Sequence, residues 1–186
     1  MKKGFSLPEL LIAITITALV VEAAYFASRI GQATFKTTAE KIELAQNARV
    51  ILDRMSREVR QATDIVTELP PGSDDPTDPP KNTIMFEDGH TTINRYISYN
   101  LENNNAYRTV TAYYFGTTLP DSSEWVVHDA IDSENNPPNS TNISNNLIAE
   151  NITSLKIYGD SVIYIEMTAS KDDQTADFAT AVYPRN

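Results

Sequence analysis

Residues 5–27 read FSLPELLIAITITALVVEAAYFA and decide the fold of this chain. Glu9 and Glu22 are the only charged residues among them. As an α-helix, the 18 residues 10–27 would span roughly 27 Å, close to the hydrocarbon core of a membrane, which is about 30 Å thick. The basic segment MKKG at residues 1–4 would hold the preceding end in the cytoplasm. The stretch is therefore predicted to be a helix that can cross a membrane.

A cleaved secretory signal peptide would have the same basic start and apolar core. In that case Val21, Glu22 and Ala23 would form the end of the signal, with the cut after Ala23. Against this, Glu9 interrupts the apolar core, and a charged helical pattern continues beyond the cut. Spacing alone leaves both alternatives open.

Residues 28–66 contain no proline and are predicted to continue the helix. Apolar residues recur in them at alternating steps of three and four: Ala45, Ala48, Leu52, Met55, Val59, Ala62 and Val66. This spacing places one apolar stripe on one helix face, which we expect to pack on a sheet. A coiled coil would show the same stripe, but alanine is a weak residue at such a seam. The combined helix would be near 90 Å long, so half of it must lie in other apolar surroundings.

The second half of the chain has the pattern of β structure. Five of the ten prolines fall in residues 70–80 and end the helical region. Alternating apolar runs predict strands at residues 83–86, 93–101, 107–115, 152–158, 162–168 and 178–183. The Asn-rich residues 133–146 are predicted to be a surface loop. The expected fold class is α+β, with one long N-terminal helix packed on an antiparallel sheet.

Composition excludes several functions. The chain has no cysteine, which rules out disulfides, thiol nucleophiles and Cys-ligated metals. Its formal net charge of −10 argues against nucleic acid as the main partner. His90 and His128 are the only histidines, and no nucleophile motif accompanies them, so no enzyme activity is predicted.

Residues 1–12, MKKGFSLPELLI, resemble the prepilin leader of the type IV filament family, which includes pili, type II secretion pseudopilins and competence pili. The resemblance implies that a prepilin peptidase cuts between Gly4 and Phe5 and methylates the new N-terminus of Phe5. It also implies that Glu9 faces the N-terminal amine of a neighbouring subunit during assembly. A buried amine there would remove the cost of an unpaired carboxylate in a membrane helix.

The resemblance also implies an organisation and a location. Residues 1–4 are the leader, residues 5–27 the transmembrane and filament-core helix, and residues 28–186 a soluble pilin-like domain with helix at 28–66 and β structure at 83–186. The precursor would cross the inner membrane once, with its soluble domain outside the cytoplasm, before joining a periplasmic or cell-surface filament. Its partners would be other subunits, the peptidase, the inner-membrane assembly machinery and membrane lipid. No cofactor is implied.

A second resemblance bears on the kind of subunit. Residues 52–62, LDRMSREVRQA, are similar to the helix end of J-type minor pseudopilins and W-type minor pilins. A minor subunit in filament initiation or at the tip is therefore implied. A shaft subunit and a competence pilin for DNA uptake stay open as alternatives, and so does a secreted binding protein with an ordinary signal peptide.

Acidic residues raise two further questions. Asp74, Asp75 and Asp78 in the proline-rich segment are calcium candidates, because the related G-type pseudopilins hold calcium in a loop. Their spacing is not that of an EF-hand, and solvated acidic turns are commoner, so no metal is predicted. Glu22 is expected at the outer membrane interface.

Overall fold

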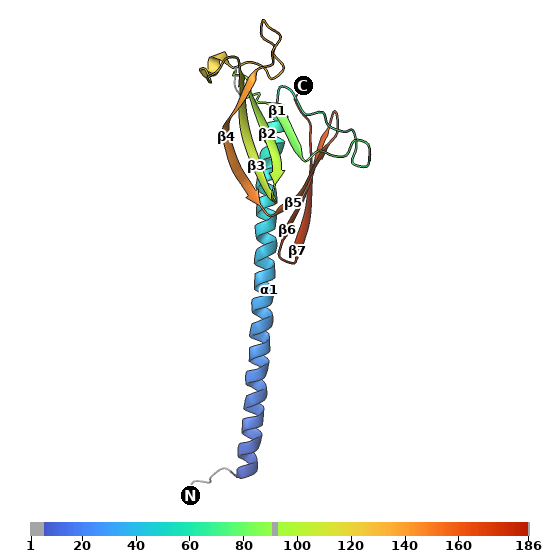
Figure 1. Cartoon of the computed structure of the whole chain (residues 1–186). Coiled ribbons are helices and arrows are strands. Elements are labelled where there is room, and N and C mark those ends of the chain that lie inside the picture. The colour runs from blue at the N-terminus through green and yellow to red at the C-terminus, as the bar shows by residue number, and fades with distance from the viewer. Residues whose placement is uncertain (1–5, 91–92, 186) are drawn as a thin grey trace. The chain divides into compact units, whose positions relative to one another are not determined.

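The computed structural model describes residues 6–90 and 93–185 (Figure 1). One long helix, α1 (Leu7–Gln61), precedes the β structure. The strands are β1 (Thr83–Glu87), β2 (Arg95–Glu102), β3 (Asn105–Tyr114), β4 (Asn139–Glu150), β5 (Ile152–Tyr158), β6 (Ile163–Lys171) and β7 (Gln174–Val182), with a short 3₁₀ turn, η1 (Ser122–Glu124), between β3 and β4. The chain divides into two compact units, Met1–Lys41 and Ile42–Asn186.

The first unit consists, in its described part, of the N-terminal stretch of α1. It contains an 18-residue window that is long and apolar enough to cross a membrane, and none of that window is buried. The hydroxyls of Thr15 and Thr17 donate to the carbonyl oxygens of Leu11 and Ala13, at 2.9 and 2.8 Å. Each hydroxyl is thus satisfied within its own helix, which suits a threonine in apolar surroundings.

In the second unit, α1 buries one face. The buried residues are Leu44, Ala48, Ile51, Leu52, Met55 and Val59, followed by Ala62 just past the helix end. This confirms most of the predicted stripe. Ala45 is instead exposed, and Leu44 and Ile51 take part in the buried face. A straight α-helix has 3.6 residues per turn, so its buried face drifts away from residues that follow a strict seven-residue repeat.

The helix predicted to reach residue 66 ends at Gln61. Residues 63–67 instead run beside β1, where the amide of Thr63 donates to Glu87 and the amide of Val66 donates to Met85. Their backbone groups are therefore satisfied by the sheet rather than by another helical turn.

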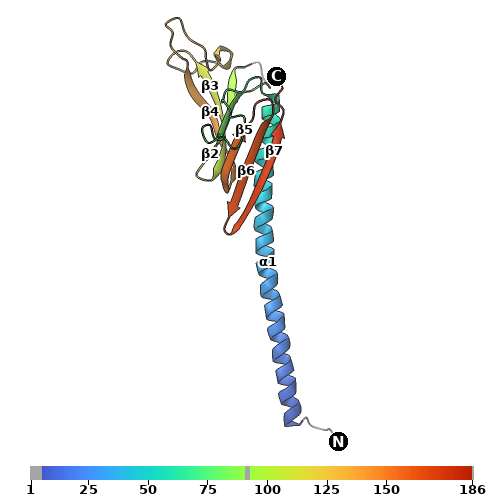
Figure 2. The same cartoon turned by 90° about the vertical axis from the view of Figure 1, so that its right-hand side faces the viewer.

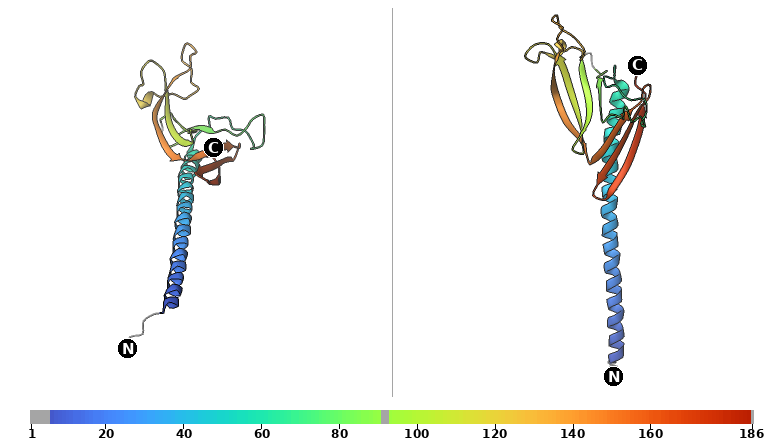
Figure 3. Two further views of the ribbon diagram at one scale, coloured as in Figure 1. Left: turned by 60° about the horizontal axis from the view of Figure 1, so that its bottom comes forward. Right: turned by 45° about the vertical axis from the view of Figure 1, so that its right-hand side comes forward.

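The strands form two antiparallel sheets rather than one, while the α+β class is confirmed. One sheet has the order β1-β2-β3-β4 and the other β5-β6-β7. Figure 3 shows the sheets meeting where β4 passes into β5. At this point Asn151 has a φ of 64°, a left-handed conformation that turns the chain between the two sheets.

The asparagines between the predicted strands 93–101 and 107–115 form the loop of a tight hairpin that joins β2 to β3. Asn103 and Asn104 have φ angles of 49° and 62°, and Glu102 pairs with Asn105 across this two-residue loop. Two successive positive φ angles match the twist of the flanking strands, and asparagine tolerates that conformation better than most residues.

The prediction of a loop over residues 133–146 is wrong for its second part, because residues 139–150 form β4. Side chains help to pair this polar strand with β3. Thr109 bonds to Asn145 and Thr111 to Asn142, each at 3.1 Å. Asparagine and serine disfavour a β-strand. These side-chain hydrogen bonds and the position of β4 at the edge of the sheet nevertheless allow the segment to form one.

The core of the second unit joins α1 to both sheets. Its largest fully buried side chains come from α1, β1, β2, β5 and β6: Leu44, Ile51, Met55, Ile84, Phe86, Ile97, Tyr99, Ile152, Ile157, Ile163 and Ile165. Figure 2 shows the second sheet lying along the C-terminal part of α1.

Replacing Gly159 by alanine is expected to destabilise the second unit by about 2 kcal/mol or more. Gly159 has a φ of 116°, and a Cβ there would lie 1.9 Å from the carbonyl oxygen of Val162. Gly72→Ala is the control, because nothing lies within 4 Å of a Cβ at that position. Urea unfolding should separate the two variants, and equal midpoints would contradict the prediction.

Candidate functional site

The first turn of α1 is closed by a short polar contact. Ser6 stands at the N-cap, and both its amide and its hydroxyl donate to Oε2 of Glu9, each at 2.8 Å. The amide of Leu10 donates to the carbonyl oxygen of Ser6 at 3.1 Å. A glutamate at the third helical position that reaches back to the N-cap amide is half of a capping box. The contact holds the Glu9 carboxylate at the very start of the helix.

Beyond this turn, residues 10–21 present apolar side chains on all sides of the helix, and further large apolar side chains follow up to residue 35 of the first unit. Its exposed large hydrophobic residues are Leu7, Leu10, Leu11, Ile12, Ile14, Ile16, Leu19, Val20, Val21, Tyr25, Phe26, Ile30 and Phe35. A helix that is apolar all round is suited to lipid or to other apolar helices rather than to water. Glu9 therefore places a carboxylate at the N-terminus of a strongly apolar helix.

The comparisons with known proteins address this same stretch. The family model for the prokaryotic N-terminal methylation motif matches residues 1–24. The chain therefore carries a prepilin-type signal. This signal is that of type IV pilins and pseudopilins, and with the apolar helix it supports membrane anchoring and a structural filament subunit. No curated protein and no solved structure matches the chain.

The matched residues 1–24 include the three residues that the sequence assigns to processing and assembly. Gly4 and Phe5, the predicted cleavage and methylation residues, lie outside the described residues. Glu9 lies inside them and is exposed. Sequence reasoning identified Glu9 from the motif but did not foresee its contact with Ser6. The spacing Ser-x-x-Glu would have indicated that contact.

The calcium candidates Asp74, Asp75 and Asp78 point to separate partners. Asp74 accepts from Ser73, Asp75 accepts from the amide and hydroxyl of Thr77, and Asp78 pairs with Lys81 at 2.7 Å. The Thr77 hydrogen bonds lower the pKa of Asp75. Within residues 6–90 and 93–185, no three His, Cys, Asp or Glu side chains are grouped so that they could hold a metal ion.

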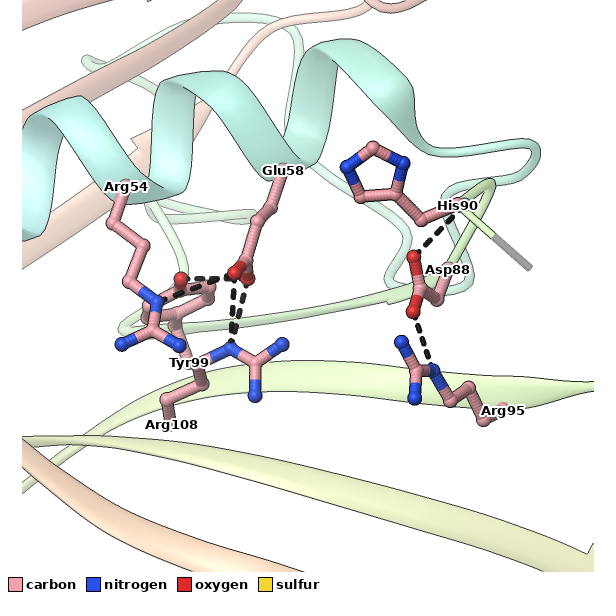
Figure 4. A network of polar contacts seen from close by, with 7 residues as sticks. All are labelled: Arg54, Glu58, Asp88, His90, Arg95, Tyr99 and Arg108. Atoms are coloured by element: carbon pink, nitrogen blue, oxygen red, sulfur yellow. Dashed lines mark hydrogen bonds and ion pairs between the residues drawn. The ribbon is translucent and has the colours of Figure 1, made fainter.

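A buried charge cluster ties α1 to the first sheet and was not foreseen (Figure 4). Glu58 on α1 accepts hydrogen bonds from the Tyr99 hydroxyl at 2.8 Å and from Arg108 Nε at 2.9 Å. Arg54 Nε adds a contact at 3.2 Å one helical turn away. The side chains of Glu58 and Arg108 are only 13% and 11% exposed. We call Arg54, Glu58, Tyr99 and Arg108 the Glu58 cluster.

The electrostatics of the Glu58 cluster follow from its burial. Burial acts to lower the pKa of Arg108, but the hydrogen bond and the charge of Glu58 outweigh it and raise that pKa. Burial and the adjacent Glu58 carboxylate raise the pKa of the Tyr99 hydroxyl. Arg108 therefore stays charged and Tyr99 stays a hydrogen-bond donor. The cluster fixes the position of α1 against β2 and β3.

A second ion pair joins the neighbouring strands, as Figure 4 also shows. Asp88, next to the end of β1, accepts from Nε of Arg95 at the start of β2 and from the amide of His90.

His128 packs its ring against Tyr96 and Tyr113, with centroids 5.2 and 6.3 Å apart. Both histidines thus take part in structural contacts.

Proposed function

We propose that the chain is a non-catalytic minor pilin or pseudopilin, a subunit of a type IV pilus or of a type II secretion-like filament. The observation that carries this proposal is the match of residues 1–24 to the N-terminal methylation motif. The exposed apolar helix that the motif opens also supports a membrane-anchored filament subunit, because its side chains are stable only when lipid or other helices surround them.

In this proposal, Lys2 and Lys3 orient the precursor in the inner membrane. The prepilin peptidase cuts between Gly4 and Phe5 and methylates the amine of Phe5. The helix of residues 5–27 then waits in the lipid, with the soluble part outside the cytoplasm. On assembly it leaves the lipid and packs among the helices of other subunits.

Glu9 would set the axial register of that packing. A carboxylate deep in a membrane and without a partner costs about 2.5–3.5 kcal/mol on insertion scales. The Ser6 contacts already hold Oε2 at the first helical turn. A protonated amine from a neighbouring Phe5 would complete the pairing of the carboxylate. Because this ion pair can form at only one axial offset between neighbouring helices, it would stabilise that register alone.

The resemblance of residues 52–62 to J-type and W-type subunits supports a place in initiation or at the tip. In the structure, this segment supplies Leu52, Met55 and Val59 to the core and Glu58 to the buried cluster. A shaft subunit or a competence pilin would use the same N-terminus. The number of copies in isolated filaments separates these roles, since a tip or initiating subunit is present in far fewer copies than a shaft subunit.

Mass spectrometry of the mature N-terminus from the native host tests the proposal. We expect a chain that begins at Phe5 and carries one added methyl group. Gly4→Leu should leave the leader attached, because a bulky side chain beside the cut bond would hinder the peptidase. A chain that begins at Ala24 would overturn the filament function and indicate a secreted protein.

A further inference from the structure

The edges of the two sheets differ in how they are protected. An unprotected strand edge exposes backbone N–H and C=O groups that another strand can pair with. Residues 63–67 cover the edge of β1, and Lys81 exchanges two backbone hydrogen bonds with Ile157 at the edge of β5, at 3.0 and 2.8 Å. The outer edge of β4 belongs to a strand with two register irregularities, which blunt an edge by bending it.

The edge strand β7 has none of these protections among the described residues. It pairs with β6 over nine successive residues without a register shift. Its sequence, QTADFATAV, has no proline and no lysine, and Asp177 is its only charge. Small side chains make up most of the rest, so that another backbone could approach closely.

A groove lies between this edge and α1, and all of it belongs to the second unit. Its volume is about 670 Å³. Ile42, Ala45 and Arg49 line the helix side, and Phe178 and Thr180 line the strand side. Ile42 is 53% exposed although it is apolar. Figure 2 shows β7 running along α1 at this place.

We propose that β7 and this groove bind an extended segment of a different subunit of the same filament, which adds a fourth strand to the second sheet. The backbone of the segment would form hydrogen bonds with β7. Its side chains would alternate between the two faces of the sheet, so that every second one contacts α1. Those side chains are apolar, because they lie over Ile42, Ala45 and Phe178. This inference rests on the proposed function, since it takes its partner from the same filament.

Charge identifies the partner as a different chain. Asp53 and Asp177 both line the groove, against the one cation Arg49. A second copy of this chain would bring the same acidic strand, and each copy has a net charge of −10. Like charges of this size disfavour self-association. The bound segment should therefore carry a basic residue opposite Asp53, because the Asp177 carboxylate accepts a hydrogen bond from Thr168 on the other face of the sheet.

The chain has no cysteine, so one introduced cysteine is the only thiol of this chain that a maleimide can label. Ala179 is exposed on β7, and Asn146 is exposed on β4, the other sheet's edge strand. Full-length Ala179→Cys and Asn146→Cys chains would be labelled with a benzophenone maleimide in the native host and irradiated. Mass spectrometry would then identify the residue joined to each position.

From position 179 we expect a cross-link to another subunit that has a prepilin-type signal, within a segment of alternating apolar residues. From position 146 we expect none. Adding Thr180→Lys, which places a charge in the groove, should abolish the cross-link, whereas adding Asn146→Lys should leave it unchanged. The folding of each variant is checked by its thermal unfolding.

Three results would overturn the inference: a cross-link from position 179 to a second copy only, one that survives Thr180→Lys, or none in a chain that is present in filaments. The last result leaves the proposed function standing, because incorporation is observed separately. A mature chain beginning at Ala24 would instead overturn the proposed function itself.

Discussion

Glu9→Ala is expected to abolish incorporation of the chain into filaments while its insertion into the inner membrane continues. The substitution removes the carboxylate that we propose to pair with a neighbour's amine. It also removes a polar group from an apolar helix, so membrane insertion should become easier. The measurement compares the amount of chain in the membrane fraction with the amount in sheared or purified filaments.

The expected size of the effect follows from the energy of the contact. If an unpaired charge costs about 2.5–3.5 kcal/mol in the apolar core, loss of the pairing lowers the assembled fraction by a factor on the order of one hundred. The neighbour's amine is then the charge left without a partner. This loss would be visible in filaments even when the membrane fraction is unchanged.

Two matched variants separate pairing from capping. Glu9→Gln keeps an oxygen that can accept from the Ser6 amide but has no charge, and it should also fail to assemble. Ser6→Ala removes only the hydroxyl contact with Glu9, and it should assemble. Glu22→Ala removes the other acidic residue of the apolar stretch and should assemble as well. Normal incorporation of Glu9→Ala would disprove the register role.

Much of the fold could be predicted from local sequence, because its causes are local. The helix follows from a proline-free run with apolar residues at steps of three and four. The β2–β3 hairpin follows from asparagines that tolerate positive φ angles at 103 and 104. In both cases, neighbouring residues suffice to set the backbone conformation.

Other features depend on contacts between distant residues. Glu58 and Arg108 are 50 residues apart, and neither position alone shows that the other is close. The polar segment that forms β4 is a strand because its backbone pairs with β3, and hydrogen bonds from Thr109 and Thr111 to its asparagines support that pairing. The chain passes from one sheet to the other at Asn151, which has a left-handed conformation. The pattern of apolar residues does not predict that conformation.

The candidate sites divide in the same way. Glu9 was singled out from a short motif, because the residues that form the motif are its neighbours in sequence. The groove beside β7 was not identified, since an edge strand is recognised only when the order of the strands is known. The aspartates of the proline-rich segment show the opposite case, in which residues close in sequence bind separate partners.

Glu58→Ala is expected to be the most destabilising single change in the second unit outside the apolar core. It leaves the Arg108 guanidinium buried without the carboxylate that accepts from it, and it removes the acceptor of the Tyr99 hydroxyl. Breaking a buried ion pair by removing one partner costs about 3–5 kcal/mol. Thermal unfolding of the full chain in detergent, followed by circular dichroism, should show a Tm lower by roughly 10 °C or more.

Arg54→Ala is the control, because Arg54 contacts the same carboxylate from a side chain that is 37% exposed. Exposed pairs contribute about 0.2–1 kcal/mol, so its Tm should change by only a few degrees. Equal effects of Glu58→Ala and Arg54→Ala would show that the Glu58–Arg108 contact is no stronger than a surface pair.

A double variant tests whether burial of an unpaired charge causes the loss. Glu58→Met alone leaves Arg108 charged and without its acceptor, whereas Glu58→Met with Arg108→Met removes both charges and fills the space with apolar atoms. We expect the double variant to be more stable than Glu58→Met alone, which additive effects could not produce. A double variant less stable than either single variant would mean that the two side chains stabilise the unit independently of each other.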